Sequence, residues 1–144
     1  MNSIQKFGIS LLLILIGILI VPSYLLAQGE KTMPSGWGYV WADKPTAREY
    51  TPNEAYSYNS SRKEIEISRK GTGRYKVTFY GLGGGKTAGG NVQVTAYGPG
   101  NEFCKVEYWI SGGLDFIVHV RCFTVSGNPV DTRFSLRVDW PDKY

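Results

Sequence analysis

The chain has few of the residues from which most metal and enzyme sites are built. Its 144 residues include two cysteines, Cys104 and Cys122, and one histidine, His119. A zinc site needs three or four nitrogen or sulfur ligands, and strand alternation places His119 on the face opposite Cys122. We therefore expect no metal site and no cofactor. The chain also lacks a Gly-x-Ser-x-Gly sequence, the usual setting of a serine nucleophile on an α/β sheet.

The titratable residues show no catalytic pattern. His119 lies within an alternating segment, whereas a general base needs a substrate proton within hydrogen-bond reach. Asp115, Asp131 and Asp139 have no spacing that brings two carboxylates together, so a glycosidase pair is unsupported. We expect Asp131 to shape the turn before the last strand. The protein is predicted not to be an enzyme.

Strong charge of one sign is lacking too. The chain has 16 Lys and Arg against 12 Asp and Glu, a net charge of +4. The basic residues are scattered, as on a solvated surface, and do not form a track for nucleic acid, so no nucleic-acid partner is expected. The glycine-rich segment 80–87 resembles a phosphate-binding loop. Tyr80 stands where that loop has its first glycine, and no helix pattern follows, so we interpret the segment as a linker.

One long hydrophobic run is present, at the N-terminus. Lys6 precedes an aliphatic stretch over 9–21, and Ala27 offers a small residue at a cleavage position. Residues 1–27 are therefore predicted to be a signal peptide, and residues 28–36 a linker. The alternative is an uncleaved anchor, because the apolar stretch approaches the roughly 20 residues that cross a bilayer. The expected location is secreted, periplasmic or on the cell surface; in the alternative, the N-terminus anchors the chain to the membrane.

The remaining chain alternates apolar and polar residues with the period of β-strands. Tyr75, Val77 and Phe79 share one face of a strand, and their neighbours share the other. Turn residues separate eight predicted strands, which are 37–42, 55–59, 64–69, 74–80, 91–97, 103–109, 115–123 and 132–140. No ten-residue window has a helical period. We expect a single all-β domain over 37–140, an eight-stranded antiparallel sandwich or barrel-like fold.

Two parts of this domain resemble each other. Segment 74–79 matches 133–138 in its alternation, and a glycine-containing turn precedes each. This predicts a duplicated four-strand unit, with halves 37–80 and 91–140. The alternative is chance, because alternating strands resemble one another.

Alternation also predicts that the two cysteines form a disulfide. Cys104 shares a strand face with Val106, and Cys122 shares one with Val118 and Val120, so both point into the core from successive strands. Export places them in an oxidising compartment. Closing a loop of this size stabilises a fold by about 3 kcal/mol in the chain-entropy account.

Aromatic residues give the strongest indication of function. Trp37 and Trp41 share one strand face, and alternation places Tyr97 and Trp109 on the polar faces of their strands. Exposed rings on a rigid β scaffold stack on sugars or anchor a protein partner. The alternative is that they fill the core. The candidate ligand-binding residues are Trp37, Trp41, Trp109 and Tyr97.

Several short motifs resemble those of a known family. They are Tyr-Val-Trp-Ala at 39–42, Tyr-Thr-Pro at 50–52, Gly-Thr-Gly at 71–73, Val-Thr-Ala-Tyr-Gly at 94–98, Cys-Lys-Val at 104–106, Val-x-Cys-Phe at 120–123 and Pro-Val-Asp at 129–131. As a set they resemble a family of uncharacterised secreted bacterial β-rich proteins. The resemblance covers 37–138 and implies secretion, bacterial origin and a β fold. It implies no activity and no site residue.

These observations favour a secreted, non-catalytic binding or cell-surface module that recognises a glycan or an extracellular protein. One alternative is a structural envelope or matrix subunit that self-associates through a sheet edge. Another is an inhibitor of an extracellular enzyme, with the exposed loop 81–90 in the cleft of its target.

Overall fold

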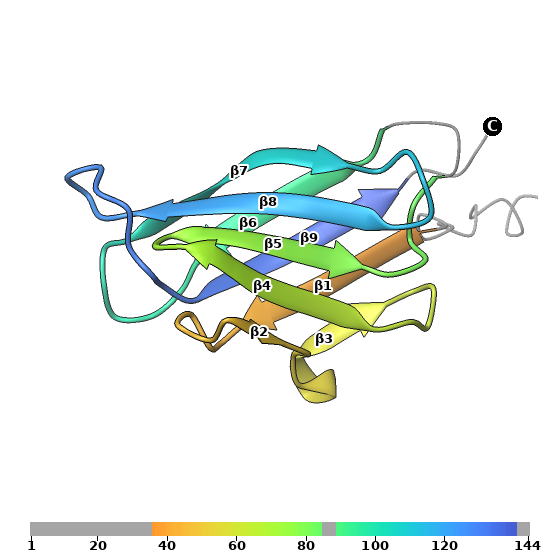
Figure 1. Cartoon of the computed structure of the whole chain (residues 1–144), viewed down its shortest axis with the longest axis horizontal. Helices are drawn as coiled ribbons and strands as arrows, with labels where there is room; N and C mark the ends of the chain where they lie inside the picture. The colour runs from red at the N-terminus through yellow and green to blue at the C-terminus, as the bar shows by residue number, and fades with distance from the viewer. Residues whose placement is uncertain (1–35, 85–88, 141–144) are drawn as a thin grey trace, which may run out of the picture. The chain divides into compact units, whose positions relative to one another are not determined.

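The computed structural model describes residues 36–84 and 89–140 (Figure 1). The predicted signal peptide and nearly all of the predicted linker lie outside these residues. Within the described part of the chain, no helix has the length and hydropathy to cross a membrane.

The described residues form nine β-strands and one short 3-10 turn. They are β1 (Gly36–Ala42), β2 (Glu49–Tyr50), η2 (Glu54–Tyr56), β3 (Ser57–Asn59), β4 (Ile65–Gly71), β5 (Arg74–Phe79), β6 (Asn91–Ala96), β7 (Phe103–Ile110), β8 (Phe116–Phe123) and β9 (Phe134–Trp140). All eight predicted strands are present, and only β2 was missed. The strand predicted over 55–59 is shorter than expected, because the Asn53 side chain caps η2 by accepting from the Ala55 amide.

The strands form two antiparallel sheets, which confirms the all-β prediction and gives a sandwich-like fold. One sheet has the order β3-β1-β9-β6 and the other the order β2-β4-β5-β8-β7. In Figure 1 the four-stranded sheet lies behind the five-stranded sheet. Strand β9 therefore lies inside its sheet, with β1 on one side and β6 on the other.

The predicted four-strand halves do not form separate sheets. Each sheet takes strands from both halves, and the two matched strands, β5 and β9, lie in different sheets. Their matched residues Tyr75 and Phe134 meet across the core, with ring centroids 5.1 Å apart.

The core lies between the sheets and consists of alternate residues of each strand. Its largest fully buried side chains include Phe79, Phe116 and Phe134. Gly38 lies among them, because a Cβ there would stand 2.7 Å from the Phe79 ring. Since Val40 faces the core, the odd-numbered residues of β1 face outward.

The predicted disulfide is confirmed. Cys104 of β7 and Cys122 of β8 are direct register partners, and their sulfurs are 2.02 Å apart. Cys122 is fully buried, and Cys104 is partly buried and packs against the core. The bond therefore joins the edge strand β7 to the interior of its sheet.

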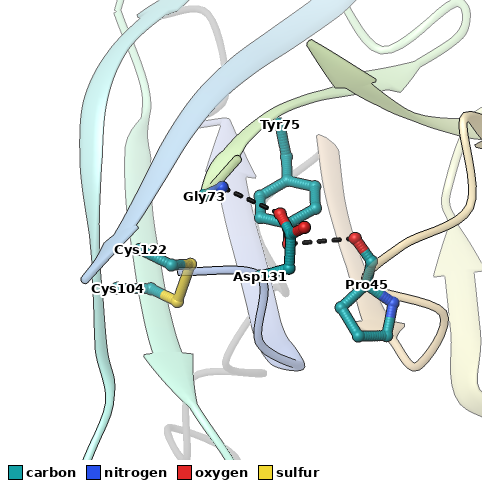
Figure 2. Close-up of a disulfide and its surroundings, with 6 residues drawn as sticks. All are labelled: Pro45, Gly73, Tyr75, Cys104, Cys122 and Asp131. Carbon is teal, nitrogen blue, oxygen red and sulfur yellow. Dashed lines mark hydrogen bonds between the residues drawn. A yellow bond between two sulfur atoms is a disulfide. The ribbon is translucent and has the colours of Figure 1, made fainter. Parts of the chain in front are cut away.

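Asp131 ties the β4–β5 turn to the segment that leads into β9 (Figure 2). Its carboxylate accepts the Gly73 amide at 2.8 Å and the Arg69 guanidinium, whose Nη2 is 2.8 Å away. The Tyr75 hydroxyl lies 3.2 Å from the same carboxylate and 3.1 Å from the Pro45 carbonyl. Burial disfavours the charged carboxylate, but these hydrogen bonds outweigh it and hold the pKa of Asp131 below its ordinary value.

Candidate functional site

The outer side of the four-stranded sheet carries a set of aromatic side chains, which we call the aromatic face. β1, β3, η2 and the residue that follows β6 contribute to it. Its members are Trp37, Tyr39, Trp41, Tyr56, Tyr58 and Tyr97. Three of them are substantially exposed: Trp41 (44%), Tyr56 (48%) and Tyr58 (42%). A contiguous group of exposed rings on one sheet indicates a binding surface.

The rings of the aromatic face stack on one another. Trp37 and Tyr58 have centroids 4.4 Å apart, and Trp41 and Tyr56 have centroids 4.9 Å apart with planes 10° from parallel. Tyr97 contacts Trp41 from a different element, at 5.7 Å. The planes of Trp41 and Tyr56 are nearly parallel, whereas the Trp37–Tyr58 and Trp41–Tyr97 pairs are tilted by 31° and 48°.

Two arginines complete the packing. The Arg137 guanidinium lies over the Trp37 ring, 5.5 Å from its centroid, and Arg133 lies over Tyr97 at 5.3 Å. Arg137 is itself held by Asp139, with an ion pair of 2.9 Å. Trp37 therefore has a protein group on each side, Tyr58 and Arg137.

The tyrosines end the stacks. Tyr58 lies on β3, the edge strand of its sheet, and Tyr56 lies in the preceding turn. Tyr56 stacks on Trp41 of β1, and Tyr58 stacks on two residues of β1, Trp37 and Tyr39, with centroids 4.4 and 6.4 Å away. Tyr56 and Tyr58 nevertheless remain 48% and 42% exposed, and with Trp41 they are the members of the aromatic face that offer ring surface to a ligand.

Tyr58 also borders a groove of 340 Å³, which we call the β3 groove. Its other lining residues belong to the segment before η2, to η2, to β3, and to the turn into β4 with the first residue of that strand: Thr51, Pro52, Glu54, Ser57, Asn59, Arg62, Lys63, Glu64 and Ile65. The volume lies within the range of about 300–1,000 Å³ that small-ligand sites occupy.

Buried Asn59 holds the turn that forms one wall of the β3 groove. Its side-chain amide donates to the carbonyls of Lys63 at 3.1 Å and Tyr80 at 2.9 Å, and its oxygen accepts from Ser61. Arg62, in this turn, has a φ of 60° and is the one non-glycine residue of the described ranges in the left-handed region. Such conformations persist where the surroundings enforce them, and they cluster at ligand sites.

The β3 groove contains both signs of charge. Glu54 and Glu64 provide carboxylates, and Arg62 and Lys63 provide cations. None of the four forms an ion pair with another described residue. Their polar atoms are therefore available to a ligand, as both donors and acceptors.

The structure brings three of the four predicted site residues together. Trp37, Trp41 and Tyr97 lie on the aromatic face, and Trp109 does not. A bulge at Glu107 shifts the register of β7, so that Trp109 pairs with buried Val118 and faces the inner side. The prediction that Trp109 points to the polar side of its strand was therefore wrong, but the ring is 41% exposed on the edge strand β7, as expected of a candidate residue. Its indole donates to the Gly89 carbonyl at 2.9 Å, which gives the ring a structural role.

Sequence reasoning missed Tyr56, Tyr58 and Arg62 as site residues. The shared face of the two tyrosines is visible in the sequence, since they are two apart. Their position at the ends of the stacks depends on the pairing of β1 with β3. The backbone of Arg62 has no local sequence signal, because arginine rarely adopts a positive φ.

His119 lies on the outer side of the five-stranded sheet, away from the aromatic face. Its ring stacks on Tyr108, with centroids 4.2 Å apart. Burial lowers the pKa of His119, Glu107 opposes that effect, and nearby cations including Lys76 lower it further. Over residues 36–84 and 89–140, no three His, Cys, Asp or Glu side chains are grouped to hold a metal ion.

Comparison of the chain with protein-family models, with curated proteins and with solved structures finds no match.

Proposed function

We propose that the protein is a secreted, non-catalytic module that binds a glycan, with the β3 groove and its adjoining tyrosines as the site. The observation that carries the proposal is the meeting of exposed Tyr58 with a groove of 340 Å³ that contains unpaired donors and acceptors. Sugars present apolar C–H faces, which pack on aromatic rings, and rims of hydroxyls, which need both kinds of hydrogen-bonding group.

The magnitudes suit a weak binder. Two ring contacts at about 1 kcal/mol each, with two or three hydrogen bonds at about 1 kcal/mol each, total about 4–5 kcal/mol. Before the cost of association is subtracted, that sum corresponds to a dissociation constant of about 0.2–1 mM, so one short oligosaccharide binds no more tightly than this. Several sites on one polymer or one cell surface would raise the effective affinity.

A glycan fits the site better than a flat protein surface does. Trp37 is packed between Tyr58 and Arg137, so this large ring is not free to insert into a partner, and the exposed rings, Trp41 among them, are held by stacking on their neighbours. The groove is a defined concavity, and the turn that holds Arg62 is fixed by buried Asn59. A preformed concave site favours a small, polar ligand.

Secretion is part of the proposal. It rests on the predicted signal peptide, and the disulfide is compatible with an oxidising compartment. The resemblance to secreted bacterial β-rich proteins agrees with this location and adds nothing about the ligand.

The test is binding to a panel of neutral and acidic oligosaccharides, measured by saturation-transfer NMR with the disulfide intact. For the glycan that binds, the variants Tyr58→Ala and Arg62→Ala are each expected to raise the dissociation constant about fivefold or more. Phe103→Ala is the matched control, because Phe103 is an equally exposed ring (46%) on the other sheet. A panel with no binding at millimolar concentration, or equal losses in all three variants, would refute the site.

A structural, self-associating subunit is the second candidate. Apolar side chains of the edge strand β7 are exposed, among them Phe103 (46%) and Ile110 (46%). Exposed apolar edge strands favour edge-to-edge association. A concentration-dependent mass in light scattering would support this candidate, and a constant monomer mass would exclude it. The third expectation, an inhibitory loop over 81–90, falls partly outside the described residues.

A further inference from the structure

A row of cations crosses the outer side of the five-stranded sheet. Arg121 of β8 lies opposite Arg74 of β5 and opposite Lys105 of β7. Like charges directly opposite one another in an antiparallel sheet are destabilising. Among the described residues, this row of cations forms one ion pair, between Arg121 and Glu107 at 3.4 Å. The repulsion among Arg74, Arg121 and Lys105 therefore lowers the stability of the sheet.

The neighbouring row of side chains, which contains His119, is also surrounded by cations. His119 lies between Lys76 of β5 and Tyr108 of β7. Lys76 is paired with Glu66 at 3.6 Å, whereas Lys70 and Arg74, at the ends of the β4–β5 turn, form no ion pair with any described residue. Two unneutralised cations thus lie beside the histidine.

A pocket of 180 Å³ lies at this point, and it is lined by Lys70, Arg74, Tyr75, Glu107, Tyr108, His119 and Val120. The one carboxylate among them, Glu107, is paired with Arg121 at 3.4 Å, so the cations Lys70 and Arg74 are left to face a ligand. The pocket is smaller than the sites of drug-sized ligands, which occupy about 300–1,000 Å³. Its size and charge suit one tetrahedral oxyanion group. The arginine fork matches such a group with two parallel hydrogen bonds, and lysine adds a mobile donor.

We propose that this pocket binds a sulfate or phosphate group, either free or as part of an acidic polymer, with Lys70, Arg74 and His119 as its donors. The site lies on the sheet opposite to the β3 groove and does not depend on glycan binding there. Tyr108 forms one wall and keeps the His119 ring in place by stacking.

The site strengthens as the pH falls. The charged and titratable groups around His119 are Lys76 and Arg74 of β5, Lys70 of β4, Glu107 and Tyr108 of β7, and Arg121, two residues along its own strand. Burial and the cations keep the pKa of His119 low, so the ring is largely neutral at pH 7. A bound oxyanion favours the protonated ring and raises that pKa. Affinity therefore rises as the pH falls through the pKa of the ring in the bound state towards the lower pKa of the ring in the free protein.

The test compares three probes at low ionic strength by isothermal titration calorimetry: sodium sulfate, dextran sulfate and neutral dextran. We expect dextran sulfate to bind and neutral dextran not to bind. Binding of sodium sulfate as well would identify the free oxyanion as sufficient, and binding of the polymer alone would identify an acidic polymer. Absence of binding by both sulfated probes at pH 5.5 would overturn the proposal.

Variants separate the pocket from general charge attraction. Arg74→Gln and Lys70→Gln are each expected to weaken binding of the sulfated probe about tenfold, and His119→Gln to remove its pH dependence. Arg48→Gln is the matched control, since Arg48 is exposed and lies outside the pocket. An equal loss in Arg48→Gln would show binding to net charge and overturn the site. Tyr58→Ala should leave sulfate binding unchanged, so this proposal and the glycan proposal fail separately.

Discussion

Replacing Asp131 by asparagine should destabilise the fold by about 3 kcal/mol. The carboxylate accepts the Gly73 amide at 2.8 Å and receives Arg69 and the Tyr75 hydroxyl, while its own side chain is only 17% exposed. Hydrogen bonds to a charged group are worth about 1.5–3 kcal/mol each, and a buried donor left without a partner costs a further 1–3 kcal/mol. Asparagine has the same shape and keeps one acceptor oxygen. The expected loss of unfolding free energy therefore lies near the lower end of what these two contributions add up to.

The assay is urea unfolding followed by tryptophan fluorescence, with the disulfide intact, over pH 2 to 7. The folded pKa of Asp131 is lowered, so its stabilisation is present above the unfolded value of about 3.9 and is lost as the pH falls through the folded value. The native protein should therefore lose stability relative to the variant below about pH 4. Asp43→Asn is the control, because no hydrogen bond to the Asp43 side chain is found among the described residues. Equal stability of D131N and the native protein at pH 7, or the same difference at pH 2.5, would refute the reasoning.

Three further predictions concern stability. Reduction of the disulfide should lower the free energy of unfolding by about 3 kcal/mol, and urea titrations with and without reductant measure this. Gly38→Ala should cost about 1–3 kcal/mol, because its Cβ would stand 2.7 Å from the Phe79 ring; a neutral result in thermal melts would contradict the packing. Trp109→Phe should cost about 1 kcal/mol by removing the donor to the Gly89 carbonyl, and faster amide exchange at the start of β6 would accompany it.

Alternation alone was enough to predict most of the fold. Its period of two places Tyr75, Val77 and Phe79 on one face, and each of them is buried. The same rule placed both cysteines inward from successive strands, where they are bonded. These features follow from short-range pattern, because each strand must bury one face.

What the sequence could not predict depends on register and long-range contact. The bulge at Glu107 reverses the alternation of β7 after Val106, so Tyr108 faces outward and Trp109 inward. An extra residue in one strand leaves no local signature. β2 has two residues, too few for any periodicity. The β3 groove exists because η2, β3 and the turn into β4 meet, and the backbone of Arg62 completes it.

The most direct test of glycan binding at the β3 groove is an amide NMR titration of the protein with the oligosaccharide that the panel identifies. The account predicts shift changes confined to residues 54–64 and the neighbouring end of β1, with loss of those changes in Tyr58→Ala. Shift changes centred on β7 and β8, with 54–64 unaffected, would contradict it.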